Sequence, residues 1–417
     1  MILYANLVSD LAVDLAQRDV LRAWAEQAPR EVWLLRPGDV LVSPVPVGEE
    51  FLRYACGLMR IRPESVAVVV TARPFEAVSG PGPPPGVVPA VLKAARGRPE
   101  AVLPTALDSS AVALAHALGV PVAPFPSAEA AEAALRITRS LNTKAAFRST
   151  ARELGMQLPD GRVCRREELP DAVDALLHLH GRVVVKPDRS AGGHGLRFLP
   201  AANGAGPLDD LPAVGGRDGL WVVEEHIDTA RAVSIQMETG PRGPRPVFSG
   251  EMRTVEGSFT GYLAPLPAAL EEIGPTLEGW GTALGRHLAG HGYAGPFGLD
   301  AMVSAAGELL AGESNVRRTA TTTPHALVQR LAADSGTTAT AWATGTRRTS
   351  RRYRFDEAVR LLGAERIAYD PARGEGVVLY AGAPSDGRTW RYAVIAGSHA
   401  SVARYEELLD STWASAP

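Results

Sequence analysis

A lysine followed closely by a serine and three glycines gives the sequence its strongest chemical signal. The apolar run from Val183 to Val185 predicts a short strand that delivers Lys186 to a glycine-rich loop. Glycines let backbone N–H groups converge on phosphate oxygens, and the lysine adds a positive charge. The order of the residues differs from G-x-x-x-x-G-K-[ST], so a P-loop is excluded, and a plain glycine-rich hairpin turn is the alternative. The candidate phosphate-binding residues of the loop are Ser190, Gly192, Gly193 and Gly195.

Two carboxylates and an amide near the end of a predicted hairpin could bind a metal ion. The strand-like segments 299–303 and 309–312 are separated by a short turn. If these segments pair, Asp300 and Glu313 lie on neighbouring strands, and Asn315 points to the same face as Glu313. Oxygen donors of this kind suit Mg²⁺ held jointly with phosphate oxygens. Acidic residues are also common on ordinary hairpins, so this group does not decide the function by itself.

A third segment could contact a nucleotide base. Residues 220–225 predict an apolar strand that ends in Glu224 and Glu225 and is followed by His226 and Ile227. The end of such a strand can present backbone carbonyl and N–H groups to the edge of an adenine ring. Taken alone, the segment is better explained as a strand that ends at the surface.

The three segments and Lys144 occur in an order and spacing that resemble the ATP-grasp superfamily of carboxylate–amine ligases. The resemblance covers about half of the chain, residues 136–331. It implies that two lysines contact the nucleotide phosphates, that the glycine loop is a flap over them, and that the strand end holds adenine. It also implies a Mg²⁺ ion on the acidic group, with ATP and Mg²⁺ as cofactors. The residues assigned in this way are Lys144, Lys186, Ser190, Gly192, Gly193, Gly195, Glu224, Glu225 and Ile227 for the nucleotide, and Asp300, Glu313 and Asn315 for the metal.

Other positions of the same resemblance concern catalysis and specificity. Arg317 matches the arginine that stabilises charge on the transferred phosphoryl group, so the resemblance implies that Arg317 and Lys186 are catalytic. The acidic residue that often binds the ribose is missing near residues 231–232, and Asp228 is the candidate substitute. Gly298 stands where many D-alanine–D-alanine ligases carry a reactive-centre arginine, which argues against that substrate.

A closer resemblance is to the family of the peptide ligase of pheganomycin biosynthesis. It rests on a short N-terminal α/β domain, the run at residues 313–325 and a small C-terminal α/β segment. It implies an ATP-dependent ligase that joins a carboxylic or amino acid to the amine of an amino acid or peptide through an acyl phosphate, in natural-product biosynthesis. The alternatives are an ATP-grasp enzyme of other acceptor chemistry, such as carboxylation or ligation to a thiol or hydroxyl, and a non-catalytic ATP-binding module.

Two further arginines, Arg253 and Arg318, are candidates for binding a substrate carboxylate, because arginine offers bidentate geometry. Surface salt bridges are the alternative for both. His287 and His291 are four residues apart but lack the glutamate of H-E-x-x-H, so a structural role is preferred to a zinc site. The basic run at residues 347–354 is short, and we interpret it as a solvated linker.

Composition excludes several classes of protein. The 417 residues carry a formal net charge of −3, which argues against a nucleic-acid partner or an anionic membrane surface. No apolar run reaches the roughly 20 residues of a membrane helix, and the N-terminal residues lack a secretory signal pattern. Two cysteines cannot form a disulfide framework. We therefore expect a cytoplasmic enzyme with small-molecule substrates, and the ligase resemblance implies a homodimer.

The alternation of short strands and helices predicts an α/β chain. The resemblances imply that it has three parts: a Rossmann-like pre-ATP-grasp domain at 1–134, an ATP-grasp region of two α+β lobes at 135–345, and a small α/β unit at 346–417. In the first part, helical spacing covers residues 11–27 and 109–119, and short apolar runs at 31–35 and 65–70 predict strands. Residues 135–155 are helix-compatible. The last part predicts helices at 355–363 and 401–409 and strands at 376–380 and near 392–395.

Overall fold

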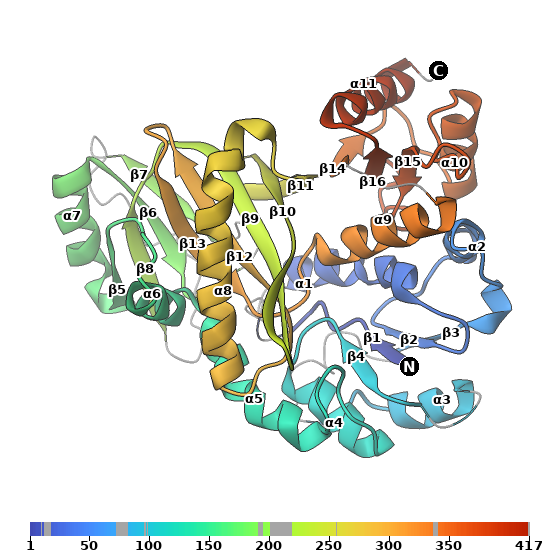
Figure 1. Cartoon of the computed structure of the whole chain (residues 1–417), viewed down its shortest axis with the longest axis horizontal. Helices are drawn as coiled ribbons and strands as arrows, with labels where there is room; N and C mark the ends of the chain where they lie inside the picture. The colour runs from blue at the N-terminus through green and yellow to red at the C-terminus, as the bar shows by residue number, and fades with distance from the viewer. Residues whose placement is uncertain are drawn as a thin grey trace.

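The computed structural model describes residues 1–9, 11, 18–71, 82–95, 97, 99–190, 195–200, 219–255, 257–336 and 341–415. These residues form three β-sheets with flanking helices, which confirms the predicted α/β class (Figure 1). A small sheet lies at one end of the molecule, and the N-terminal and C-terminal regions lie at the other (Figure 1). An eight-stranded sheet connects the two ends.

The N-terminal region is a parallel sheet of four short strands in the order β3-β2-β1-β4. Strand β3 covers most of the predicted 65–70 run, and α4 begins and ends where the 109–119 spacing predicts. Asp108 caps α4 by accepting a hydrogen bond from Ala111 N–H, and Gly119 ends it with a φ of +66°. The elements of this region are β1 (Ile2–Tyr4), α1 (Arg18–Ala25), β2 (Val40–Ser43), α2 (Glu49–Leu58), β3 (Ala67–Val70), α3 (Val87–Ala94), β4 (Val102–Pro104) and α4 (Ser109–Leu118).

The predicted strand at residues 31–35 is wrong, because this segment belongs to a 3₁₀ helix, η1 (Ala28–Leu34). A short apolar run is compatible with both a buried strand and a buried helical turn, and its sequence pattern does not distinguish them. Pro29 favours the helical start, and the Trp33 indole donates to the carbonyl of Tyr380 at 2.9 Å. Of the predicted helix at 11–27, residue 11 lies in a turn, residues 12–17 lie outside the described residues, and residues 18–25 form α1.

Two helices, α5 (Ala128–Leu141) and α6 (Lys144–Glu153), lead into the next region, and position 134 lies inside α5. The pattern at 135–155 indicates one helical stretch, whereas the structure has two separate helices there. The break falls at Asn142 and Thr143, because the Thr143 hydroxyl accepts the N–H of Ala146 and so begins a new helix. Lys144 is consequently the first residue of α6.

A four-stranded antiparallel sheet in the order β5-β8-β6-β7 forms the small lobe. Its elements are β5 (Gly161–Arg165), α7 (Leu169–His180), β6 (Arg182–Pro187), β7 (Arg197–Pro200) and β8 (Leu220–Glu225). Helix α7 covers one face with Val173 and Leu176 against Val183, Val185 and Trp221. Cys164 is buried in this cluster and Cys56 in the N-terminal region; both thiols are free.

The large sheet has the order β13-β12-β9-β10-β11-β14-β16-β15 and takes strands from the C-terminal segment as well. The predicted hairpin at 299–312 is confirmed as β12 and β13. Residue 346 lies inside β14, and Arg347 and Arg348 end this strand, so they are not part of a linker. The remaining elements are β9 (Thr229–Gly240), β10 (Gly243–Val255), β11 (Ser258–Ala264), α8 (Gly274–Gly290), β12 (Gly295–Ser304), β13 (Leu309–Asn315), α9 (Thr322–Ser335), β14 (Ala341–Arg348), α10 (Phe355–Ala364), β15 (Gly376–Leu379), β16 (Thr389–Ala396) and α11 (His399–Ser415), with 3₁₀ turns at Pro63–Ser65, Arg166–Glu168 and Ala268–Ile273.

The predicted elements of the last 70 residues are confirmed, because α10, β15, β16 and α11 overlap the expected ranges. His287 and His291 lie at the end of α8, where the two rings are 4.6 Å apart, consistent with the structural role preferred for them. No helix among the described residues is long and apolar enough to cross a membrane.

The N-terminal region is joined to the rest of the chain by a shared apolar core and a buried ion pair. One core cluster combines η1 and β1 with α9 and the C-terminal strands. At its edge, Glu31 of η1 accepts hydrogen bonds from Arg318 at 2.7 Å and from the hydroxyl of Thr323 at 2.9 Å. Glu31 is 1% exposed and Arg318 6%, so both charges are out of water.

We predict that Glu31→Ala strongly destabilises the chain, because it leaves Arg318 buried without its partner. Removing one member of a buried ion pair costs about 3–5 kcal/mol. The matched control is Glu49→Ala on α2, whose ion pair with Arg53 is solvent-exposed and is worth below about 1 kcal/mol. Urea unfolding followed by tryptophan fluorescence compares the two variants, and equal losses would contradict the structural role assigned to Glu31.

Candidate functional site

A cavity of about 980 Å³ lies where the N-terminal region, the small lobe, the large sheet and the C-terminal segment meet. It lies at the upper end of the size range of ligand pockets, which is roughly 300–1,000 Å³. Each region contributes to the lining, for example Asn6 from the N-terminal region, Lys186 from β6, Asp300 from β12 and Arg391 from β16.

The acidic group predicted to bind a metal is assembled at this cavity. Asp300 on β12 pairs in register with Glu313 on β13, directly before a β-bulge in the ladder. Asn315 donates a hydrogen bond to Asp300 Oδ2 at 2.9 Å, and its Oδ1 accepts one from Arg317 at 2.7 Å. The hairpin therefore brings the four predicted residues into one connected group.

The ionisation of this group shows how its charges are balanced. Burial, reinforced by the negative charge of Glu313, raises the pKa of Asp300 well above its usual value. Burial would also raise the pKa of Glu313, but the charges of Lys144 and Arg317 outweigh it and lower that pKa. Burial lowers the pKa of Arg317, and the two carboxylates offset part of this effect. The positive charges of Lys144 and Arg317 therefore compensate the negative charge of Glu313 but only part of that of Asp300.

This donor set fits a divalent cation. Two carboxylate oxygens and an amide oxygen are hard ligands, and the incompletely compensated Asp300 favours an additional positive charge. Among the described residues, no group of three or more His, Cys, Asp or Glu side chains could hold a metal ion. A cation here would need further oxygen ligands, and the oxygens of a bound phosphate would supply them.

The two predicted phosphate-binding lysines both line the cavity. Lys144 Nζ donates to the carbonyl and hydroxyl oxygens of Ser190, at 2.9 and 3.0 Å, and lies 3.3 Å from Glu313. This contact links the start of the glycine loop to the acidic group. Gly192 and Gly193 lie outside the described residues; Gly195 is described and adopts a φ of +78°, where a Cβ would also approach Pro187 at 2.9 Å.

Lys186 projects from β6 and donates to Glu224 on the neighbouring strand β8. The same carboxylate, which is 3% exposed, also accepts from Arg148 of α6. Arg148 donates further to the carbonyl of Pro159 at 3.0 Å. The side chain of Glu224 is therefore occupied in positioning Lys186, a role that the sequence pattern did not indicate for it.

Comparisons with known proteins agree with this arrangement. Residues 28–120 match the family model described as the pre-ATP-grasp domain, and residues 357–409 match the one described as the PGM1 C-terminal domain. No curated protein is significantly similar to the chain in sequence.

Solved structures match over nearly the whole chain. N5-carboxyaminoimidazole ribonucleotide synthetase from Thermus thermophilus aligns with a TM-score of 0.59 and 18% identity, over 100% of this chain and 99% of that one. Biotin carboxylase from Campylobacter jejuni, solved as a β-γ-ATP complex, aligns with a TM-score of 0.62 and 14% identity, over 98% and 90% of the two chains. The N5-carboxyaminoimidazole synthase of Aspergillus clavatus, solved with ADP and 5-aminoimidazole ribonucleotide, aligns with a TM-score of 0.55 and 14% identity, over 89% of this chain and 98% of that one.

The chain has the ATP-grasp fold. Its two lobes are the small sheet and the β9–β13 part of the large sheet, and the cavity lies between them. The predicted fold class, including the pre-ATP-grasp domain, is therefore confirmed.

The residues predicted to hold adenine lie at and just after the end of β8 and line the cavity. The backbone N–H of Ile227 makes no hydrogen bond to another described residue, so it is available to a ligand. The carboxylate of Glu225 accepts from Asp160 N–H at 2.8 Å and lies 3.4 Å from His180, so this side chain is turned toward β5. Asp228, the candidate ribose ligand, also lines the cavity but pairs with Arg182 at 2.6 Å.

Gly298 has no room for a side chain. An added Cβ would lie 2.8 Å from Gln236 Nε2 and 3.2 Å from the methyl group of Thr319. The Thr319 hydroxyl donates to Gln236 Oε1 at 2.9 Å, which fixes both groups. An amide and a hydroxyl side chain thus occupy the space beside Gly298.

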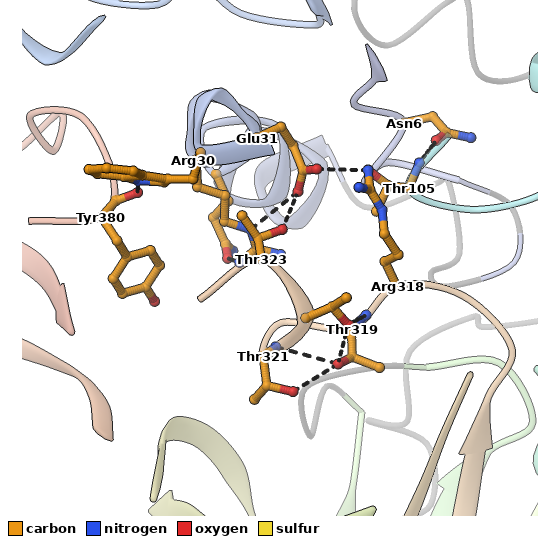
Figure 2. A network of polar contacts seen from close by, with 12 residues as sticks. Asn6, Arg30, Glu31, Thr105, Arg318, Thr319, Thr321, Thr323 and Tyr380 are labelled. Carbon is orange, nitrogen blue, oxygen red and sulfur yellow. Dashed lines mark hydrogen bonds and ion pairs between the residues drawn. The ribbon is translucent and has the colours of Figure 1, made fainter. Parts of the chain in front are cut away.

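The two arginines suggested for a substrate carboxylate are both paired within the chain. Arg253 binds Glu406 of α11 in a bidentate pair, with one contact at 2.8 Å, and does not line the cavity. Arg318 lines the cavity, but Glu31 neutralises it (Figure 2). The structure therefore gives no support for Arg253 as a substrate ligand, and Arg318 reaches the cavity only as part of an ion pair.

Sequence reasoning missed two other arginines of the cavity, Arg30 and Arg391. Nothing in the sequence around Arg30 shows that it is buried. For Arg391 a signal exists, because Trp390 and Tyr392 alternate with it along β16 and fill the opposite face.

We predict that Glu224 and Arg148 are strongly coupled. In a double-mutant cycle of Glu224→Gln and Arg148→Met, each single change leaves a buried group with an incomplete set of partners, so the double variant should be less destabilised than the sum of the singles. We expect a coupling energy of about 1–3 kcal/mol from urea unfolding. The exposed pair Glu238 and Arg245 is the control cycle. Coupling in the first cycle no larger than in the control would contradict the charge arrangement described for Lys186.

Proposed function

We propose that the chain is an ATP-dependent ligase that joins a carboxylic or amino acid to the amine of an amino acid or peptide, through an acyl phosphate. The observation that carries this proposal is the convergence of Lys144, Lys186, Arg317 and the acidic group at one part of a cavity that extends well beyond them. We further propose a cytoplasmic, homodimeric enzyme of natural-product biosynthesis that acts on small molecules.

The nucleotide would lie between the lobes. Its phosphates would contact Lys144, Lys186 and the loop that begins at Ser190, and its adenine would meet the N–H of Ile227. The rings of Phe198 and His226, 5.3 Å apart, and the side chain of Met302 line this part of the cavity and offer an apolar surface for a base. Magnesium bound by Asp300, Glu313 and Asn315 would neutralise phosphate charge.

The chemistry then needs two displacements. A carboxylate oxygen of the acid attacks the γ-phosphorus of ATP, the bond to the β,γ-bridging oxygen breaks, and ADP leaves. The amine attacks the carbonyl carbon of the resulting acyl phosphate, the bond to the phosphate oxygen breaks, and phosphate and one proton leave. Arg317 and Lys186 stabilise negative charge on the transferred phosphoryl group, and catalysis comes from positioning and electrostatics.

Carboxylation is the second candidate, because the structural neighbours include a biotin carboxylase and N5-carboxyaminoimidazole ribonucleotide synthetases. In that case bicarbonate would be the acid that is activated. The acidic group, complete with its lysines and arginine, argues against a non-catalytic ATP-binding module.

We predict ADP and phosphate release that depends on both an acid and an amine. The assay combines Mg²⁺ and ATP with pooled amino acids and short peptides, including guanidino acids, and mass spectrometry identifies the products of active pools. A product lighter than its two parts by one water indicates amide ligation. Incorporation of ¹³C-bicarbonate into a product, without any condensation product, would contradict the amide proposal and favour carboxylation.

We predict that Glu313→Gln lowers ADP release by about 100-fold or more while the fold is kept, because it removes a negative metal ligand at the phosphoryl group. The matched control is Glu308→Gln, an exposed residue in the turn of the same hairpin, which should retain full activity. Circular dichroism verifies the fold of both variants. Normal turnover of the Glu313 variant would refute the metal assignment.

A further inference from the structure

Arg30 is a buried guanidinium with few partners. It is 3% exposed and lines the cavity from η1. One of its nitrogens donates to the neutral amide of Gln27 at 3.0 Å, and its Nε has no hydrogen-bond partner among the described residues. Its contact with Glu31 is a distant 3.9 Å. A buried charge is stable only when it is paired and hydrogen-bonded, so this arrangement lacks an anion.

The neighbouring carboxylate is already in use. Both oxygens of Glu31 accept hydrogen bonds from other residues, one from Arg318 at 2.7 Å and one from Thr323 at 2.9 Å (Figure 2). Glu31 therefore neutralises Arg318 and leaves the charge of Arg30 largely uncompensated.

A second arginine enters the same part of the cavity from the C-terminal segment. Arg391 of β16 is half-buried, and among the described residues the only hydrogen bond of its side chain is a long one, 3.5 Å, to the hydroxyl of Thr346. Burial lowers the pKa of Arg30, and the charges of Arg391 and Arg318 lower it further, so these cations lie within electrostatic reach of Arg30. Figure 2 shows Arg30 beside Tyr380, which also lines this part.

The two sides of this subsite are held together. The Trp33 indole on η1 donates to the carbonyl of Tyr380, which directly follows β15. Strand β15 in turn pairs with β16, which carries Arg391. The contact fixes the N-terminal and C-terminal segments relative to each other, so the backbone positions that carry the two arginines are set before any ligand binds.

We propose that Arg30 and Arg391 bind the free carboxylate of the amine substrate, which is therefore an amino acid or a peptide with an unblocked C-terminus. This inference rests on the proposed ligase function. The carboxylate that becomes phosphorylated must lie beside Arg317 and the acidic group, and Arg318 is neutralised by Glu31. The second anion-binding site, at Arg30, is therefore assigned to a second carboxylate. An amino acid or a peptide carries an amine and a carboxylate in the same molecule.

The test measures binding of defined probes to the full chain with Mg²⁺ and the non-hydrolysable analogue AMP-PNP. The probes are the proteinogenic amino acids, dialanine and diglycine, each beside its C-terminal amide, and ribose 5-phosphate. We expect at least one free acid to bind, and its C-terminal amide to bind at least 10-fold more weakly, because the amide keeps the amino group but lacks the negative charge of the carboxylate. Binding of no free acid, equal binding of acid and amide, or binding of ribose 5-phosphate alone would overturn the proposal.

Two variants locate the effect. Arg391→Met should weaken binding of the free acid 10-fold or more, to the level of the amide, with AMP-PNP affinity unchanged, and Arg30→Met should do the same. Because Arg30 is buried, Arg391→Met decides the outcome if the Arg30 variant does not fold. Arg348→Met, at an exposed residue of β14 paired with Asp386, is the matched control. Retention of acid-selective binding by Arg391→Met would also refute the subsite.

The same titrations separate this proposal from the function on which it rests. If AMP-PNP fails to bind the parent chain, the proposed ATP-dependent function fails. If AMP-PNP binds and discrimination between acid and amide is absent, only the carboxylate subsite fails.

Discussion

Asp300 and Glu313 face each other across β12 and β13, and two carboxylates so close together repel unless positive charge lies nearby. The chain meets this constraint with one cation from a distant segment and one from nearby: Lys144 begins α6, and Arg317 lies just past the end of β13. Because Lys144 also binds Ser190, the same balance of charges connects the acidic hairpin to the small lobe and its glycine loop. A bound nucleotide with its cation would enter a site whose charges are already arranged for it.

The cavity depends equally on contacts between segments far apart in the sequence. Glu31 binds Arg318, and the indole of Trp33 binds the carbonyl of Tyr380, so a single 3₁₀ helix contacts both the ATP-grasp region and the C-terminal segment. The C-terminal strands extend the large sheet and bring Arg391 to the cavity. In this arrangement the groups suited to phosphate lie at one part of the cavity, while the terminal regions line another part.

Local patterns were sufficient to predict the α/β class and the group around Asp300, because strand alternation and a short turn place Glu313 and Asn315 on one face, whereas the ATP-grasp fold was predicted from the family resemblance. They failed at η1, where a buried apolar run has no period that separates a strand from a helical turn. They also could not show that Glu224 would hold Lys186, nor that Arg253 would be taken up by Glu406, because such pairings depend on tertiary contacts. The uncompensated charge of Arg30 is visible only once Glu31 is seen to bind Arg318.

The most direct test of acyl-phosphate ligation is the fate of oxygen from the acid. The acid identified by the substrate screen is labelled with ¹⁸O in its carboxylate and incubated with ATP, Mg²⁺ and the amine, and the released phosphate is analysed by mass spectrometry. The account predicts one ¹⁸O atom in each phosphate formed, because the attacking carboxylate oxygen leaves with the phosphoryl group. Unlabelled phosphate accompanied by full amide formation would contradict it.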